Sequence, residues 1–178
     1  MLAITEKILV HQIKNGDEQA FALFYNKYQQ KIYRFICFRV SDQEKAQDLV
    51  SDTFIRVFDY LRDGREIKNF QAFLYKTARN LVIDFYRSRR DEVSLEDAPE
   101  VISEEDMREQ ADEKLVIENI RKHLSEIEPI YQDPVLLHFF DGLSFKQVAE
   151  VLDITQTNAR QRAHRGFKKL KSVVKFSF

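Results

Sequence analysis

Residues 144–171 carry many side chains that could bind nucleic acid. A predicted helix in the second half of this stretch presents amides, guanidinium groups and ammonium groups on its outward face. The members of that face are Gln156, Thr157, Arg160, Gln161, His164, Arg165 and Lys168. Amide and guanidinium groups read base edges in the major groove of DNA, and cations bind the phosphates. The pattern therefore predicts a helix that contacts duplex DNA.

A second, shorter helix must position this face. Ser144 and Gln147 have the spacing of a capping box, which predicts a helix start. Asp153 stands where the chain must turn, and Thr155 can cap the next helix. Four residues spaced 4, 3 and 4 apart then form the inward face of that helix: Ala159, Ala163, Gly166 and Leu170. Together these features predict a helix-turn-helix.

A second basic face lies on a predicted helix over residues 70–89. It consists of Lys76, Arg79, Asn80, Ile83 and Arg87, opposite an apolar stripe. These side chains suit a phosphate backbone and exposed bases. Tyr75 and Tyr86 could stack on unpaired bases. A solvated helix face with two surface tyrosines is the alternative interpretation.

The net charge of −1 hides an uneven distribution of charge along the 178 residues. Residues 160–178 hold seven Lys or Arg and no acid, and residues 76–90 hold five against Asp84. Residues 91–113 hold eleven acids against Arg108. Two basic surfaces separated by an acidic segment are typical of a protein that binds nucleic acid at two places.

The periodicity predicts an all-α protein of two small helical domains joined by a flexible acidic linker. The predicted boundaries are 5–90 for the first domain, 91–112 for the linker and 113–174 for the helix-turn-helix domain. Predicted helix signals include caps at Asp17 and Asn69, a capping box formed by Ser41 and Glu44, and stops at Gly16 and Gly64. A helix is also expected near 131–140; Pro134 is tolerable only in the first turn of a helix, which leaves the start of this one open.

Catalytic and metal-binding patterns are weak in this chain. The four histidines lie far apart and lack the spacing of metal ligands. Cys37, the single cysteine, lies between apolar neighbours and suggests a buried inert thiol. We therefore expect no enzyme, no metal and no cofactor. The absence of a signal peptide or an apolar run long enough to span a bilayer favours a cytoplasmic protein without membrane insertion.

Four motifs in order resemble the bacterial sigma-70 family, and the two-domain length resembles its extracytoplasmic-function group. They are DEQAFALFYNKYQQKIYRF (17–35), AQDLVSDTFIRVF (46–58), FQAFLYKTARNLVIDFYRSRR (70–90) and LSFKQVAEVLDITQTNARQRAHRGFKKLK (143–171). The resemblance covers residues from about 17 to 172. The sequence departs from the family where Asp153 replaces a usual glycine and where Ala159 and Ala163 replace bulkier apolar residues.

The resemblance implies a subunit that binds core RNA polymerase, through the clamp coiled coil and the flap, and reads promoter DNA. It implies polymerase contacts at Asp48, Asp52, Phe54, Val57 and Phe58, although core packing is the alternative role of the three apolar residues. It implies contacts with the melted minus-ten element at Arg65, Lys68, Asn69, Lys76, Arg79, Asn80, Ile83 and Arg87. It implies contacts with the minus-thirty-five element at Thr157, Asn158, Arg160, Gln161, His164 and Arg165.

The resemblance also implies a regulatory anti-sigma protein as a partner. Two other hypotheses explain part of the sequence. A duplex DNA-binding regulator would account for residues 144–171 but leave 45–90 without a role. A pure interaction module that binds polymerase but does not read DNA would tolerate loss of Arg160 and Gln161.

Overall fold

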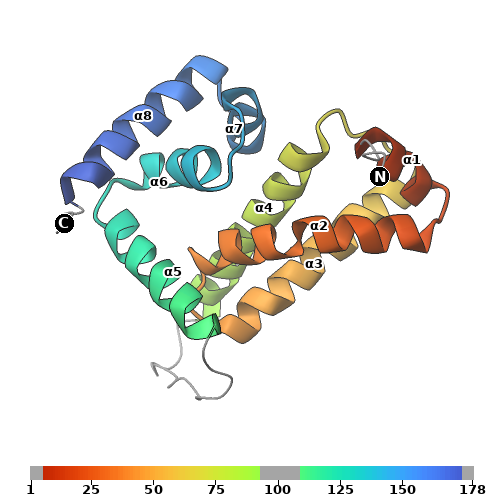
Figure 1. Ribbon diagram of the computed structural model, residues 1–178, viewed down its shortest axis with the longest axis horizontal. Helices are drawn as coiled ribbons and strands as arrows, with labels where there is room; N and C mark the ends of the chain where they lie inside the picture. The colour runs from red at the N-terminus through yellow and green to blue at the C-terminus, as the bar shows by residue number, and fades with distance from the viewer. Residues whose placement is uncertain (1–5, 93–108, 174–178) are drawn as a thin grey trace.

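The computed structural model describes residues 6–92 and 109–173, and every regular element in these two ranges is a helix (Figure 1). The first range contains α1 (Glu6–Lys14), α2 (Glu18–Cys37), α3 (Gln43–Arg62) and α4 (Phe70–Glu92). The second contains α5 (Glu109–Ser125), α6 (Pro129–Val135), the π-helix η1 (Leu136–Phe140), α7 (Phe145–Leu152) and α8 (Gln156–Val173). We call α1–α4 the N-terminal unit and α5–α8 the C-terminal unit.

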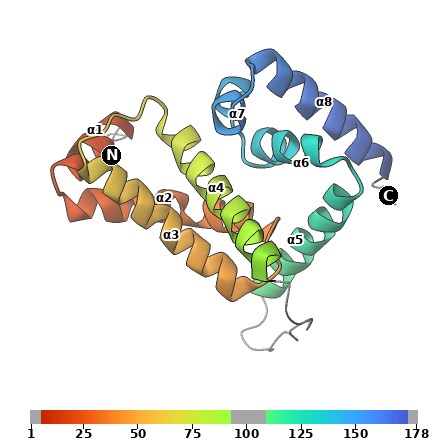
Figure 2. The same ribbon diagram turned by 180° about the vertical axis from the view of Figure 1, so that it is seen from behind.

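Aromatic residues fill the core of the N-terminal unit, where α2, α3 and α4 pack together (Figure 2). The ring of Phe24 on α2 lies 5.6 Å from that of Phe54 on α3 and 4.5 Å from that of Phe70 on α4, centroid to centroid. Edge-to-face pairs at such distances are favourable beyond the area that they bury. The apolar stripes predicted for these helices therefore meet at one centre and fix the direction of α4.

Helix starts follow the predicted caps at two of three places in the N-terminal unit. The Asp17 carboxylate accepts hydrogen bonds from the backbone N–H groups of Gln19 and Ala20, and the Asn69 side chain accepts one from Ala72. The predicted capping box at Ser41 is wrong, because α3 begins one residue later and Asp42 is its cap. An ionised carboxylate at this position also interacts favourably with the helix dipole.

Two prolines, Pro129 and Pro134, lie in α6 of the C-terminal unit. Pro129 is the first residue of α6, so Pro134 lies in its second turn, and the expectation that it is tolerable only in a first turn is wrong. A proline inside a helix removes one N–H donor and crowds the preceding turn. The chain continues directly into the π-helix Leu136–Phe140.

Helices α6 and α8 pack against each other at Gly166. A Cβ added at this glycine would lie 2.7 Å from Tyr131 Cβ and 2.7 Å from Val135 Cγ2. Both distances are far shorter than a normal contact, so the helices approach this closely only because residue 166 has no side chain. The predicted small face of α8 is confirmed, with Ala159, Ala163 and Leu170 also buried.

Replacing Gly166 by alanine should lower the free energy of unfolding by about 1–2 kcal/mol. Overpacking typically costs about 1–3 kcal/mol, and alanine recovers part of this through its higher helix propensity. Urea denaturation followed by circular dichroism measures the change. Ser172→Ala, at an exposed position on the same helix, is the control and should change stability by less than about 0.5 kcal/mol.

The expected division into 5–90, 91–112 and 113–174 stays a prediction. Helix α4 extends to Glu92 and α5 begins at Glu109, so both ends of the predicted linker 91–112 are helical. Its central part, residues 93–108, lies outside the described residues. Within the described ranges, no helix is long and apolar enough to cross a membrane.

Candidate nucleic-acid interface

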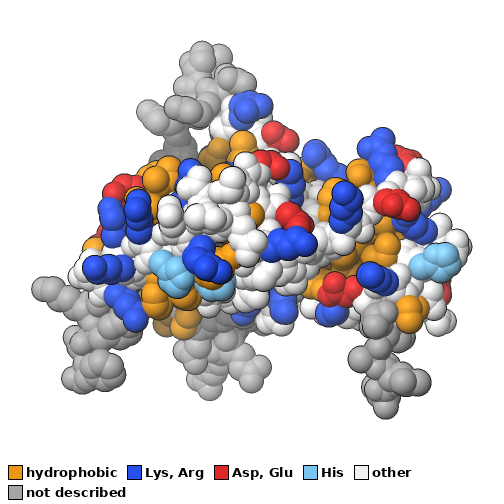
Figure 3. All heavy atoms as spheres, turned by 90° about the horizontal axis from the view of Figure 1, so that it is seen from above, with side chains coloured by type: hydrophobic (Ala, Val, Ile, Leu, Met, Phe, Trp, Pro, Cys, Tyr) orange, Lys and Arg blue, Asp and Glu red, His pale blue; other side chains and the backbone are white. Residues whose placement is uncertain are grey.

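The outward face of α8 is solvent-exposed along its first three turns. The side chain of Ser144 accepts a hydrogen bond from the Gln147 N–H to start α7, Asp153 adopts a left-handed conformation (φ 53°), and Thr155 caps α8. The two caps and the turn were predicted from the sequence, and together they set the direction of α8. All six candidate base and phosphate contacts on it are exposed: Thr157, Asn158, Arg160, Gln161, His164 and Arg165. Figure 3 shows Lys, Arg and His side chains gathered on this part of the surface.

An aromatic side chain on α7 supports this face, and the sequence analysis missed it. The Arg160 guanidinium lies 5.4 Å from the centre of the Phe145 ring, and the His164 ring lies 5.5 Å from it. His138 also stacks on Phe145, with ring centroids 3.9 Å apart. A cation over an aromatic ring is attracted to its face. Phe145 therefore limits the side-chain conformations of Arg160 and His164, two candidate DNA contacts, before any DNA is bound.

The predicted basic face of α4 is divided between solvent and the C-terminal unit. Asn80, Ile83 and Arg87 are exposed. Lys76 instead donates to the carboxylate of Asp153 at 2.5 Å, and Arg79 Nε donates to Asp133 Oδ2 at 2.7 Å. In the loop before α4, Arg65 and Lys68 are exposed, and Asn69 caps the helix.

The two tyrosines expected near unpaired bases have different positions. Tyr75 is completely buried, so the expectation that it stacks on a base is wrong. Its ring packs edge-on against Phe35 at 5.1 Å, and burial, together with the Asp141 carboxylate, raises the pKa of its phenol. Tyr86 is exposed, and its hydroxyl donates to the backbone carbonyl of Arg39.

Asp133 on α6 binds two guanidinium groups of the N-terminal unit. Besides the bond from Arg79, its Oδ1 accepts a hydrogen bond from Arg39 Nε at 3.1 Å and one from the terminal guanidinium nitrogen of the same residue. Burial acts to raise the pKa of the Asp133 carboxyl, but the two arginines outweigh it and hold that pKa below its ordinary value. Asp133 is therefore an ionised carboxylate that links the two units.

The candidate polymerase contacts on α3 separate into core and surface residues. Phe54 and Val57 are buried in the core, with the Phe54 ring 4.7 Å from that of Tyr25, so direct contact with a partner through them is excluded. Phe58 is half-buried against Phe21. The exposed face of the helix consists of Asp48, Asp52, Ile55 and Asp59, spaced 4, 3 and 4 apart.

Ile55 is the apolar member of this acidic face, and the sequence analysis missed it. Its side chain is 56% exposed, although isoleucine is among the residues most often buried. Ile55 follows Asp52 by three residues, and residues three apart share a helix face, so this spacing indicated that Ile55 lies beside Asp52 on the exposed face. An exposed isoleucine between two aspartates suits a protein partner better than Phe54 does.

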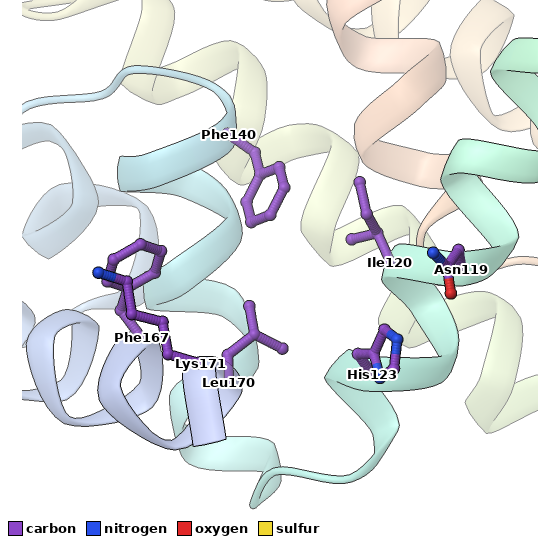
Figure 4. Close-up of a pocket in the computed structure, with 7 residues that line it drawn as sticks. All are labelled: Asn119, Ile120, His123, Phe140, Phe167, Leu170 and Lys171. Atoms are coloured by element: carbon purple, nitrogen blue, oxygen red, sulfur yellow. The ribbon is translucent and has the colours of Figure 1, made fainter. Parts of the chain in front are cut away.

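A cavity of about 260 Å³ lies between α5 and the α8–η1 pair (Figure 4). Ile120 and His123 on α5 face Phe140, Phe167 and Leu170 across it. Its walls are mostly apolar. Among the described residues, no cluster of three or more His, Cys, Asp or Glu side chains could hold a metal ion.

Family models match both units of the chain. One described as Sigma-70 region 2 matches residues 24–92, and one described as Sigma-70, region 4 matches residues 117–170. The chain belongs to the sigma-70 family. Its relatives place this sigma factor in the extracytoplasmic-function group.

Two relatives illustrate the similarity of this sigma factor to known proteins. SigW of Bacillus subtilis (strain 168), an extracytoplasmic-function RNA polymerase sigma factor, is 26% identical over 178 residues, covering 93% of this chain and 95% of SigW. BldN of Streptomyces coelicolor (strain ATCC BAA-471 / A3(2) / M145) has the same description and is 32% identical over 155 residues. That alignment covers 81% of this chain and 56% of BldN.

Solved structures share the fold of this sigma factor. CnrH, solved in complex with the cytosolic domain of CnrY, superposes with a TM-score of 0.74 over 97% of this chain and 99% of CnrH, at 20% identity. The sigma factor RpoE of Bartonella quintana, solved with the anti-sigma factor NepR, gives a TM-score of 0.66. Its match covers 89% of this chain and 98% of RpoE, also at 20% identity.

Proposed function

We propose that the chain binds core RNA polymerase, recognises promoter DNA and promotes its melting to start transcription. The exposed face of α8 is the observation that carries this proposal, since six candidate contacts lie on one side of a helix whose opposite side is buried. In this role α8 reads the minus-thirty-five element as duplex in the major groove. The chain acts as a subunit and not as a catalyst, in the cytoplasm, where the polymerase works.

Helix α4 and the loop before it read the minus-ten element in this proposal. Extruding a base from the duplex costs a few kcal/mol, so a surface that binds only certain flipped bases recovers this cost only at the right sequence. Asn80, Ile83 and Arg87 on α4 and Arg65 and Lys68 in the loop are the exposed candidates for this role. Sequence recognition and melting are then the same event.

Promoter-dependent transcription tests the proposal directly. Purified chain added to core polymerase should yield transcripts with defined start sites from a genomic library, and mapping those starts gives the promoter sequence. Stable binding to polymerase without any promoter-dependent transcript would support the pure interaction module. DNA binding without affinity for polymerase would support the duplex DNA-binding regulator.

Removing the acids of the α3 face should weaken the complex with polymerase. Asp48→Ala combined with Asp52→Ala is expected to raise the dissociation constant from core polymerase about fivefold to tenfold, because charges at the rim of an interface contribute modestly. Fluorescence anisotropy of the labelled chain measures it. Glu18→Ala combined with Glu150→Ala, at exposed sites elsewhere, makes the same charge change and should leave binding unaltered.

The proposal includes a protein that regulates this chain. RpoE, which shares the fold, was solved with the anti-sigma factor NepR. An anti-sigma partner of this chain would compete with polymerase for the units described above. Co-purification of the chain with its partners, in the presence and absence of added core polymerase, tests for such competition.

A further inference from the structure

Aromatic rings connect η1, α7 and α8 in the C-terminal unit. Helix α7 packs against both η1 and α8 (Figure 1). Phe145, the first residue of α7, is half-buried at this contact. Its ring lies next to His138 of η1 and next to Arg160 and His164 of α8. Phe145 therefore joins the chain before the helix-turn-helix to the helix that we propose reads duplex DNA.

A capping box and a stacked ring hold Phe145 in place. Ser144 Oγ accepts a hydrogen bond from the Gln147 N–H at 3.3 Å, and Gln147 Oε1 accepts one from the Ser144 N–H at 2.9 Å. These two bonds fix the backbone at the start of α7. The His138 ring stacks on the Phe145 ring, with centroids 3.9 Å apart and planes inclined by 27°. Phe145 is therefore restrained at both its backbone and its ring.

A hydrogen bond sets the orientation of His138. Its Nδ1 lies 2.7 Å from the backbone carbonyl oxygen of Leu143. A carbonyl oxygen only accepts hydrogen bonds, so Nδ1 is the ring nitrogen that carries the proton and donates. Leu143 is buried and immediately precedes the cap of α7. The bond therefore attaches the imidazole to a packed part of the chain.

Arg160 and His164 lie one turn apart on the side of α8 that meets these rings. Arg160 Cζ is 5.4 Å from the centre of the Phe145 ring. The His164 ring is 5.5 Å from Phe145 and 6.0 Å from Phe139 of η1, and Phe167 stacks on Phe139 at 4.1 Å. Residues spaced 4 and 3 apart share one side of a helix. Arg160 and His164 therefore border the packed side of α8 while they remain exposed to solvent.

Arg165 is a natural comparison for Arg160. It carries the same functional group and is exposed on the same helix. Within the described part of the chain, however, its guanidinium group makes no hydrogen bond, ion pair or ring contact. Both arginines are candidate DNA contacts, so α8 presents one restrained guanidinium group and one unrestrained one.

An aromatic ring can orient a guanidinium group without occupying its hydrogen-bond donors. The cation is attracted to the ring face, and the N–H groups lie in the guanidinium plane. A carboxylate would also orient the group, but it would accept the same N–H groups that bind a base. Arg160 has no ion pair among the described residues. Its donors are therefore available for guanine O6 and N7, the acceptors that arginine reads most often in the major groove.

We propose that His138 and Phe145, which we call the aromatic support, hold the Arg160 guanidinium in the orientation that reads a guanine of the minus-thirty-five element. The proposal rests on the proposed role of α8 in reading that element. Binding costs less free energy when the reading side chain is restrained beforehand, because less rotamer freedom is lost on binding. His138 and Phe145 are positioning residues, since they act on DNA through Arg160.

A double-mutant cycle in the complex with core polymerase separates positioning from folding. Phe145→Leu removes the ring but keeps an apolar side chain, and Phe145→Tyr keeps the ring. Each is combined with Arg160→Ala and, as the matched control, with Arg165→Ala. The probes are duplexes of the mapped promoter in which each guanine of the minus-thirty-five element is replaced in turn by 7-deazaguanine, which lacks the N7 acceptor. Competition binding measures the affinity for each duplex.

Phe145→Leu should weaken binding of the unmodified promoter about fivefold, through loss of the cation–π contact and of the rotamer restraint. It should also reduce the effect of replacing the guanine that Arg160 reads. The loss should again be about fivefold with Arg165→Ala, but less than about twofold with Arg160→Ala. Phe145→Tyr should bind like the wild type. His138→Leu, which removes the stacked ring, should weaken binding about twofold to threefold only where Arg160 is present.

Equal losses for Phe145→Leu with Arg160→Ala and with Arg165→Ala would overturn the aromatic support, because Phe145 would then stabilise the unit as a whole and not one side chain. The wild type separates this from failure of the proposed function. If its complex with polymerase prefers promoter to scrambled duplex while the cycle shows no coupling, only the aromatic support is lost. If that complex shows no preference, the role of α8 in reading promoters fails as well.

Discussion

Replacing Arg160 and Gln161 together by alanine is expected to weaken binding of the minus-thirty-five element by about 2–6 kcal/mol. Each specific base contact contributes about 1–3 kcal/mol, and both side chains are exposed in the second turn of α8. The loss should be specific to sequence, because a side chain that reads a base edge contributes little on the wrong base. Competition binding of the holoenzyme to promoter and scrambled duplexes measures the difference.

Lys168→Ala provides the matched control for this prediction. Lys168 is exposed on the same helix, where an ammonium group would bind phosphate regardless of sequence. Its loss should weaken promoter and scrambled duplex equally and reduce the salt dependence. If the Arg160 and Gln161 double variant kept full discrimination between promoter and scrambled DNA, the chain would be an interaction module and not a promoter reader.

The local elements of the chain were predictable because their signals lie close together in sequence. The Ser144–Gln147 capping box, the turn at Asp153 and the small face ending at Leu170 each depend on residues within a few positions of one another. The helix predictions that were wrong also concerned features set by neighbouring residues. Asp42 caps α3 in place of its neighbour Ser41, and the π-helix that follows Pro134 has no simple sequence signal.

Long-range pairing between side chains could not be predicted from periodicity. The periodicity of α3 places Phe54 on its apolar side and Ile55 off it, and the structure agrees, with Phe54 buried and Ile55 exposed. Nothing in the sequence predicted the ion pairs of Asp133, because its partners lie on α2 and α4 and no spacing rule relates Asp133 to them. Arg79 was identified as a candidate DNA contact by its type, but its guanidinium group is already bound to this distant carboxylate.

Asp141 is a buried acid at the same junction between the two units. Its side chain is fully shielded from solvent, and neither carboxylate oxygen has a hydrogen-bond partner among the described residues. Arg34 of α2 lies 3.9 Å away, and Tyr75 of α4 and Arg39 of α2 also face it. Burial raises the pKa of the Asp141 carboxyl from 3.8 to about 6, against the opposing effect of the arginines.

The raised pKa makes stability fall as pH increases. Between about pH 4 and pH 6 the folded chain keeps a proton on Asp141 that the unfolded chain releases. The free energy of unfolding therefore declines over this range and stays at its lower value above pH 6. For a shift of this size the total decline is about 3 kcal/mol. The lowered pKa values of Asp133, Glu6 and Glu128 act in the opposite direction and only at more acidic pH.

Asp141→Asn should therefore raise the free energy of unfolding at pH 7.5 by about 1–3 kcal/mol and leave stability at pH 4 nearly unchanged. The amide keeps the shape of the carboxyl but carries no charge into the junction. Urea titrations of both proteins from pH 4 to pH 8 measure the difference, in which the titration of all other groups cancels. Asp59→Asn, at an exposed site, should follow the wild type throughout. A variant that is less stable than the wild type at pH 7.5 would mean that the ionised Asp141 stabilises the junction through Arg34, and the direction of its pKa shift would have to be reversed.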